Sequence, residues 1–242
     1  SFSTKEAILA GKVMVWPVGF TMEAYERALN SGSFVRAFGY SIVLMIGSTA
    51  LSLIMTVLAA YPLSKKHLVG GGLVMTLFVL TMYLNPGVIP EYLNVRDFKM
   101  IDTIWSLLIP GALSAYNMII MCNAFKGIDS AIYDAAKIDG CSETRTLLSV
   151  ALPLVYPTLT TFLIVGVAGI FTNQINLYSF YGGAAPADLQ TYGYYLYSVT
   201  QKAQSRAEYP ILSAMGLLLT CVAVPLTMIV KWALEKFGPK ED

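Results

Sequence analysis

Neutral amides and tyrosine hydroxyls are among the polar groups that stand inside or at the ends of the long apolar runs of this sequence. An amide both donates and accepts hydrogen bonds, so it can bind the hydroxyls of a sugar, and an aromatic ring can stack on the apolar face of a pyranose. The candidates for a substrate path are Asn85, Tyr116, Asn117, Asn173 and Asn176. Amides also join helices to one another in membranes, and this alternative stays open.

Residue sets for hydrolysis, metal binding or nucleotide binding are missing from the sequence. His67 is the only histidine, and Cys122, Cys141 and Cys221 lack metal-ligand spacing, so we expect reduced thiols and no metal. The glycines at 70–72 lack the lysine of a phosphate-binding loop. We therefore expect neither an enzyme nor a resident cofactor.

The composition indicates an integral membrane protein. Of the 242 residues, 56% are hydrophobic and 13% are charged, against roughly 25% charged residues in soluble domains. Backbone in lipid must be helical to satisfy its own hydrogen bonds, and a span needs about 20 apolar residues. We predict an all-α bundle with an arm at 1–36, a transmembrane domain at 37–232 and a tail at 233–242, with spans near 37–64, 68–88, 103–125, 155–177 and 209–230.

The polar stretch 129–157 has the features of a folded element between two spans. Asp129 or Ser130 can cap a helix that ends at Gly140, because glycine readily takes the left-handed conformation after a helix. Ser142 can cap a second helix, from Glu143 to Leu152, before Pro153 and Pro157 interrupt it. The stretch predicts a helix, a glycine turn and a helix.

The spacing in this stretch resembles the EAA loop of the permease subunits of ABC importers. Asp134, Ala135 and Ala136 stand four residues before Gly140, and nine residues separate that glycine from the segment 150–153, Val-Ala-Leu-Pro. Asp134 replaces the usual glutamate and Val150 the usual isoleucine. The resemblance implies that the loop at 129–152 docks on an ATP-binding subunit through Asp134, Ala135, Ala136, Asp139, Gly140, Glu143, Arg145, Leu152 and Pro153.

Other segments resemble the carbohydrate-type, maltose-permease-like importers. The segment 16–21 is similar to one that follows the first span in that group, which implies six spans in the full chain, the first before Ser1. The segments 83–90 and 108–112 look most like the branch for acidic oligosaccharides such as alginate or pectin fragments.

The resemblance also implies partners and a location. It implies two ATP-binding subunits that bind ATP and magnesium, a second and related permease subunit, an extracytoplasmic solute-binding protein and the bacterial inner membrane. Lysines and arginines divide evenly between the two sides, so the charge count does not orient the chain. The resemblance implies that the loop at 129–152 and the tail at 233–242 are cytoplasmic and that the arm at 1–36 lies outside.

A tyrosine-rich run stands outside the predicted fourth span, at Tyr192, Tyr194 and Tyr195. Such a run is typical of an interfacial aromatic belt, and it would also suit a docking surface for the binding protein.

Two other functional classes stay open. An ion-coupled secondary transporter would usually carry ionisable residues in its spans, and the five runs contain none. An integral membrane enzyme would need catalytic side chains that converge near the interface.

Overall fold

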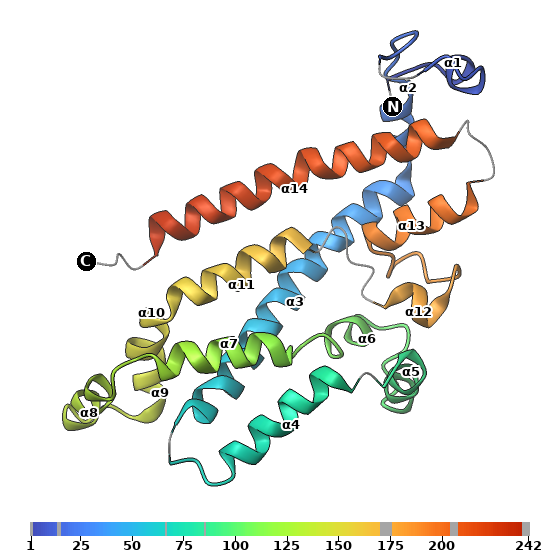
Figure 1. Cartoon of the computed structure of the whole chain (residues 1–242). Coiled ribbons are helices and arrows are strands. Elements are labelled where there is room, and N and C mark those ends of the chain that lie inside the picture. Colours follow the sequence, from blue (N-terminus) through green and yellow to red (C-terminus); the bar gives the residue numbers. More distant parts are fainter. Residues whose placement is uncertain are drawn as a thin grey trace. The chain divides into compact units, whose positions relative to one another are not determined.

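The computed structural model describes residues 2–13, 16–65, 67–84, 86–169, 176–203 and 208–238 (Figure 1). Every regular element in this part of the chain is helical, apart from one isolated bridge between Ser3 and Phe20. The predicted all-α class is therefore confirmed.

The chain divides into two compact units. Unit 1 holds residues 1–45, 100–107 and 168–228, and unit 2 holds residues 46–99, 108–167 and 229–242. The helices are α1 (Lys5–Leu9), α2 (Glu23–Leu29), α3 (Gly32–Ser64), α4 (Gly71–Tyr83), α5 (Val88–Asp97), α6 (Trp105–Leu108), α7 (Ala115–Lys126), α8 (Ser130–Ile138), α9 (Glu143–Thr146), η1 (Leu147–Ala151), α10 (Leu152–Leu154), α11 (Tyr156–Gly169), α12 (Leu177–Tyr181), α13 (Tyr192–Lys202) and α14 (Tyr209–Phe237).

Among the described residues, two helices, α3 and α14, are long and apolar enough to cross a membrane. The number rises to four if each of two bent helix pairs forms one span, namely α4 with α5 and the segment from α9 to α10 with α11. The predicted runs 37–64 and 209–230 lie within α3 and α14. Helix α4 forms residues 71–83 of the run 68–88, and α11 forms residues 156–169 of the run 155–177, in which residues 170–175 lie outside the described part of the chain.

The predicted run 103–125 is divided in the structure. Helix α6 ends at Leu108 and α7 begins at Ala115, so residues 109–114 separate two helices. Pro110 has no N–H to continue a helical ladder. Ser114 then caps α7, where its Oγ accepts from the Asn117 N–H at 3.4 Å. Hydrophobicity alone does not reveal this interruption.

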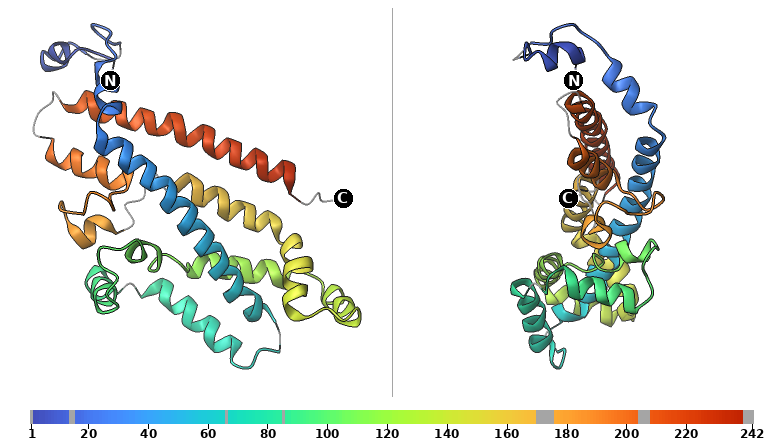
Figure 2. Two further views of the ribbon diagram at one scale, coloured as in Figure 1. Left: turned by 180° about the vertical axis from the view of Figure 1, so that it is seen from behind. Right: turned by 90° about the vertical axis from the view of Figure 1, so that its right-hand side faces the viewer.

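The core of unit 2 joins α3, α7 and η1. Its buried residues are Ala60, Tyr61, Met118, Met121, Cys122, Phe125, Leu147, Ala151 and Val155. Helix α4 lies beside α7, as both views show (Figure 1, Figure 2). The segment from α8 to α10 is therefore anchored in this core on both sides, by Phe125 of α7 before it and by Leu147, Ala151 and Val155 at its end.

The core of unit 1 centres on Tyr192, whose side chain is fully buried. Its ring meets the rings of Phe34 and Phe38 edge-on, with centroids at 5.4 and 5.9 Å. Its hydroxyl donates to the Met215 carbonyl oxygen at 2.7 Å, and its backbone N–H donates to Ser41 Oγ at 2.7 Å. Tyr192 of α13 therefore contacts both α3 and α14.

Gly166 allows α11 to approach α3 closely in unit 2. A Cβ atom at Gly166 would lie 2.9 Å from Thr49 Oγ1 and 3.0 Å from Thr49 Cγ2, so neither branch of the threonine could avoid it. We expect Gly166→Ala to lower the free energy of unfolding by about 1–3 kcal/mol, as overpacking does. Denaturant titration in detergent measures this loss.

The control for this prediction is the double variant Gly166→Ala with Thr49→Ala, which removes both clashing branches. It should recover most of the lost stability. An equal loss in the single and double variants would contradict the close contact as the cause.

Candidate functional site

Helix α8 has the ends that its sequence predicts. Asp129 Oδ1 accepts from the Ala131 N–H at 3.0 Å and caps the first turn. Gly140 follows the helix with φ +75°. The Gly140 N–H donates to the Lys137 carbonyl at 3.0 Å, and the Cys141 N–H donates to the Ala136 carbonyl at 2.9 Å. This pair of bonds is a Schellman motif, and it confirms the glycine turn.

The second half of the loop is helical but irregular. Ser142 Oγ accepts from the Arg145 N–H at 3.3 Å and caps α9, as predicted. The predicted single helix from Glu143 to Leu152 continues as the wider π-helical segment η1 and then as α10. A bend of 75° separates the segment 143–154 from α11. Prolines 153 and 157 lack the N–H groups that a straight helix would use.

The residues predicted to contact an ATP-binding subunit lie mostly on the surface. The exposed ones are Asp134, Ala135, Asp139, Gly140, Glu143, Arg145 and Pro153. Leu152 is half-buried, and Ala136 is buried against the unit rather than presented to a partner. Ile138 is 87% exposed at the end of α8, an apolar side chain of the outer face that the motif does not include.

A lysine between two aromatic rings connects α8 to the end of α3. The Lys65 Nζ atom lies 3.4 Å from the ring centroid of Tyr133, on α8, and 4.4 Å from that of Tyr61, on α3. We call Lys65, Tyr61 and Tyr133 the lysine clamp. Nothing in the linear sequence signals it, because Tyr133 is far along the chain from the other two residues.

Glu143 and Phe125 complete the surroundings of the lysine clamp. The Tyr61 hydroxyl donates to Glu143 Oε2 at 3.2 Å, and the Tyr61 ring meets Phe125 edge-on at 5.5 Å. Glu143 is therefore exposed on the surface of the loop and also contacts the core through Tyr61. Tyr61 in this way links α3 to both α7 and α9.

The electrostatics at the clamp reflect partial burial. Burial lowers the pKa of the Lys65 ammonium, the Glu143 carboxylate opposes that change, and Lys137 adds to it. Burial raises the pKa of the Tyr133 hydroxyl, and the charge of Glu143 raises it further. The raised pKa keeps the Tyr133 hydroxyl a neutral phenol at neutral pH, and the Glu143 carboxylate favours the charged form of Lys65.

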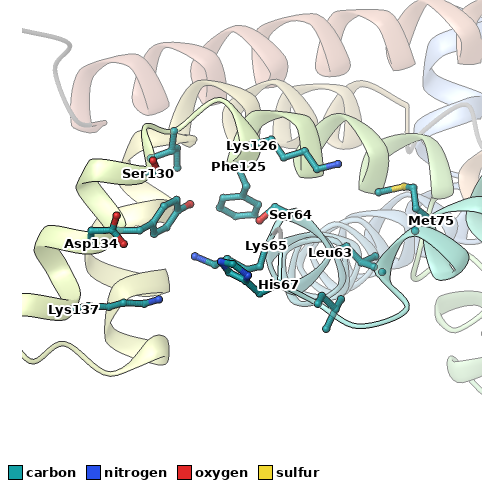
Figure 3. A pocket seen from close by; sticks show the side chains of 15 residues that line it. Leu63, Ser64, Lys65, His67, Met75, Phe125, Lys126, Ser130, Asp134 and Lys137 are labelled. Atoms are coloured by element: carbon teal, nitrogen blue, oxygen red, sulfur yellow. The ribbon is translucent and has the colours of Figure 1, made fainter.

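A pocket of about 620 Å³ opens beside the clamp. Figure 3 shows Lys65 and His67 on one side and Asp134 and Lys137 of α8 on the other. Lys126 lies at the end of α7 and also lines the pocket. No ion pair forms at Lys65, Lys126 or Lys137 within the described part of the chain.

The predicted path residues are only partly described. Asn85 and Asn173 lie outside the described residues. Tyr116, 61% exposed, and Asn117 are neighbours in the first turn of α7 in unit 2. Asn176 precedes α12 in unit 1 with φ +59°. Their role in a path stays a prediction.

The tyrosine-rich run requires a correction. The side chains of Tyr192 and Tyr194 are buried in unit 1, and the Tyr194 hydroxyl donates to the Gly182 carbonyl at 2.8 Å. Only Tyr195 is partly exposed, and its hydroxyl lies 3.3 Å from Ser31 Oγ. Tyr192 and Tyr194 therefore stabilise the core, and neither presents its ring as a docking surface or an interfacial belt.

Metal chemistry has no cluster to support it in the described residues, where no group of three or more His, Cys, Asp or Glu side chains could hold an ion. The loop at 129–152 is a surface element whose two helices are capped by Asp129 and Ser142. Its η1 residues pack into the core of unit 2, and its exposed face carries small and charged residues. Such an element can receive a protein partner.

Comparison with known proteins supports this interpretation. The chain is 34% identical over 190 residues to Protein LplC of Bacillus subtilis, covering 78% of this chain and 64% of that protein. It is 34% identical over 161 residues to the polygalacturonan/rhamnogalacturonan transport system permease protein YtcP of Bacillus subtilis, covering 66% of this chain and 56% of YtcP. The chain thus spans less than two thirds of the length of these relatives.

A solved structure has a similar fold over nearly the whole chain. A bacterial ABC transporter involved in the import of the acidic polysaccharide alginate matches with a TM-score of 0.82 and 25% identity, covering 98% of this chain and 86% of that chain. Residues 17–241 match the family described as binding-protein-dependent transport system inner membrane component. This chain belongs to that family of membrane transport components.

Proposed function

We propose that this chain is a membrane-spanning subunit of an ATP-driven, binding-protein-dependent importer, and that it forms half of a translocation path for an oligosaccharide. The observation that carries the proposal is the loop from Asp129 to Leu154. Its outer face is exposed, its turn has the Schellman geometry, and its base is packed into the core of unit 2. A partner that moves this loop would move the helices beneath it.

The partners of the proposed importer are those that the resemblance to ABC importers implies, and the family description itself refers to a binding protein. Two ATP-binding subunits would bind ATP and magnesium and dock on the loops of two permease subunits, of which the second is a related chain. A solute-binding protein would deliver the sugar on the opposite side of the inner membrane. The solved alginate transporter in complex with a pentasaccharide-bound periplasmic protein has a similar fold, with a TM-score of 0.69.

Acidic oligosaccharides are the substrate class that we favour. YtcP is named as a transporter of polygalacturonan and rhamnogalacturonan, and the similar solved structure is described as an alginate importer. Both descriptions concern uronate-containing polymers. The candidate path residues of this chain are neutral, so the charge of the sugar would be recognised by partner subunits or by the binding protein.

Movement would pass from the loop to the spans through packed contacts. Leu147 and Ala151 of η1 lie in the same buried cluster as Met118 and Phe125 of α7. Closely packed side chains transmit displacement because they leave few voids. Closure of the ATP-binding subunits on ATP would push the loop and switch the path from inward-facing to outward-facing, and hydrolysis would reset it.

Uptake by the reconstituted transporter tests the proposal. Proteoliposomes that contain both permease subunits and the ATP-binding subunits should accumulate a labelled alginate or galacturonate oligosaccharide only when ATP is supplied on the side of the ATP-binding subunits and binding protein on the other. Uptake that runs on an ion gradient without ATP would contradict the proposal, and so would turnover of the sugar by the isolated chain.

Reversal of one charge on the outer face should weaken the docking. Asp139 is exposed at the C-cap of α8, next to Gly140, and makes no ion pair in the described residues. A charge of the wrong sign in an interface can cost several kcal/mol. We expect Asp139→Lys to lower the yield of ATP-binding subunits in co-purification by about tenfold or more.

The matched control is Glu26→Lys, the same change of charge at an exposed residue of α2, in the arm predicted to lie outside. It should leave the yield unchanged. Equal yields from Asp139→Lys and the unaltered protein would argue against docking on this face.

A further inference from the structure

Helix α8 has few contacts with the rest of unit 2, although the proposed function requires it to transmit movement. Ala136 is its only buried residue in the described structure. Tyr133 is half-buried, and its ring carries the Lys65 ammonium at 3.4 Å. The attachment of α8 to α3 therefore depends strongly on one cation and one ring.

The backbone of Lys65 is held in a hydrogen-bonded turn at the end of α3. Its N–H donates to the Pro62 carbonyl at 3.1 Å, and its carbonyl accepts from the Leu68 N–H at 3.3 Å. The side chain extends from this turn toward α8 (Figure 3). A displacement of Tyr133 would thus act on a residue that is continuous with α3.

We propose that Lys65 is a positioning residue, whose ammonium holds α8 against the end of α3 so that movement of the loop reaches that helix directly. The proposal rests on the proposed function, because it names the joint through which the loop acts. Lys65 has a mechanical role here, separate from sugar binding and from ATP hydrolysis.

The charge of Lys65 is the feature that makes the joint, rather than the length of its side chain. The faces of aromatic rings attract cations because their quadrupole places negative charge there. Lys65 faces two such rings, and it forms no ion pair within the described part of the chain. The Glu143 carboxylate instead accepts from the Tyr61 hydroxyl, which fixes the second ring.

The neighbouring contacts make the clamp a junction of several helices. Tyr61 belongs to α3, packs against Phe125 of α7 and bonds Glu143 of α9. Lys65 adds α8 through Tyr133. Both halves of the loop are therefore fixed to the same point at the end of α3.

The first test measures the joint in the full chain in detergent, independently of transport. Lys65→Met keeps the unbranched apolar stem and removes the charge, whereas Lys65→Arg keeps a cation that can stack on a ring. Cation–π contacts that are partly desolvated correspond to a factor of about five to thirty in an equilibrium constant. We expect Lys65→Met to speed hydrogen exchange of the α8 amides by such a factor, and Lys65→Arg to exchange near the original rate.

The matched control is Lys126→Met, at an exposed lysine at the end of α7 that lines the same pocket but lies over no ring in the described structure. It should leave the exchange of α8 unchanged. Equal exchange rates of the α8 amides in Lys65→Met and in the original chain would overturn the clamp. Exchange in Lys65→Arg as fast as in Lys65→Met would also overturn it, because the charge at residue 65 would then not be what holds α8.

The second test uses the reconstituted transporter and the number of sugars carried per ATP hydrolysed. We expect Lys65→Met to lower this ratio about fivefold or more, Lys65→Arg to restore it, and Tyr133→Leu to add little to Lys65→Met. Additive losses would show that the two residues act separately and would overturn the joint. If the unaltered complex carries no sugar with ATP, the proposed function fails, while the exchange experiment still decides whether the clamp exists.

Discussion

We expect replacement of Gly140 by valine to uncouple ATP hydrolysis from uptake in the proposed importer, while the spans remain folded. Gly140 has φ +75°, and a Cβ atom built there meets nothing within 4 Å. The penalty for a side chain is therefore backbone strain alone, of about 1–3 kcal/mol for a residue other than glycine. A β-branched residue lies at the upper end, because its side chain crowds the left-handed backbone most.

That strain acts on the turn that orients α8 and α9. The variant can relieve it only by leaving the left-handed conformation, which breaks the bonds from Gly140 to Lys137 and from Cys141 to Ala136. A strain of about 2 kcal/mol corresponds to about thirtyfold in the population of the native turn. We expect uptake per ATP hydrolysed to fall by about tenfold or more in the proteoliposome assay.

Two further variants separate strain from bulk. Gly140→Asn should retain much of the coupling, because asparagine tolerates the left-handed region. Gly39→Val places the same side chain on α3, at a glycine with open space around its Cβ position and no positive φ, and should be neutral. Normal coupling in Gly140→Val would remove the glycine turn from the mechanism.

We expect truncation of Tyr192 to alanine to destabilise unit 1 strongly. The ring is fully buried against Phe34 and Phe38, and the hydroxyl bonds the Met215 carbonyl. Removal of a large buried aromatic side chain costs about 3–5 kcal/mol. We expect a loss of this size in the free energy of unfolding, measured by titration with a denaturing detergent.

The two parts of that loss can be measured separately. Tyr192→Phe keeps the ring and removes only the hydroxyl. The expected loss is about 0.5–1.5 kcal/mol, the net contribution of one hydrogen bond, because the Met215 carbonyl lies inside α14 and keeps its backbone partner in that helix. Tyr209→Ala changes a tyrosine that is 54% exposed and should cost less than about 1 kcal/mol. If Tyr192→Ala leaves the free energy of unfolding unchanged but abolishes docking of the binding protein, Tyr192 belongs to a docking surface and the core role is wrong.

Local signals in the sequence were sufficient for the loop. Asp129 and Ser142 cap their helices, and Gly140 ends α8, because each effect depends on groups within a few residues along the chain. The all-α class was predictable for a similar reason, since long uncharged runs have no alternative to helix in lipid.

Features that depend on distant contacts were not predictable. The tyrosine-rich run gave no sign that Tyr192 is buried, because its partners Ser41 and Met215 come from other segments. The interruption of the run 103–125 is a different case, because Pro110 and the Ser114 cap are local signals that the apolar composition of the whole run hides. Ala136 and Ile138 are both apolar residues of α8, and only the packed structure places one inside and the other outside.

Composition and short-range spacing were enough to predict the membrane class, the family resemblance and the capped loop with its glycine turn. Only the folded chain shows which loop residues face outward, which tyrosines form the core of unit 1 and how Lys65 reaches Tyr133. Burial and cation–π contact depend on distances between segments, and spacing along the chain does not specify those distances.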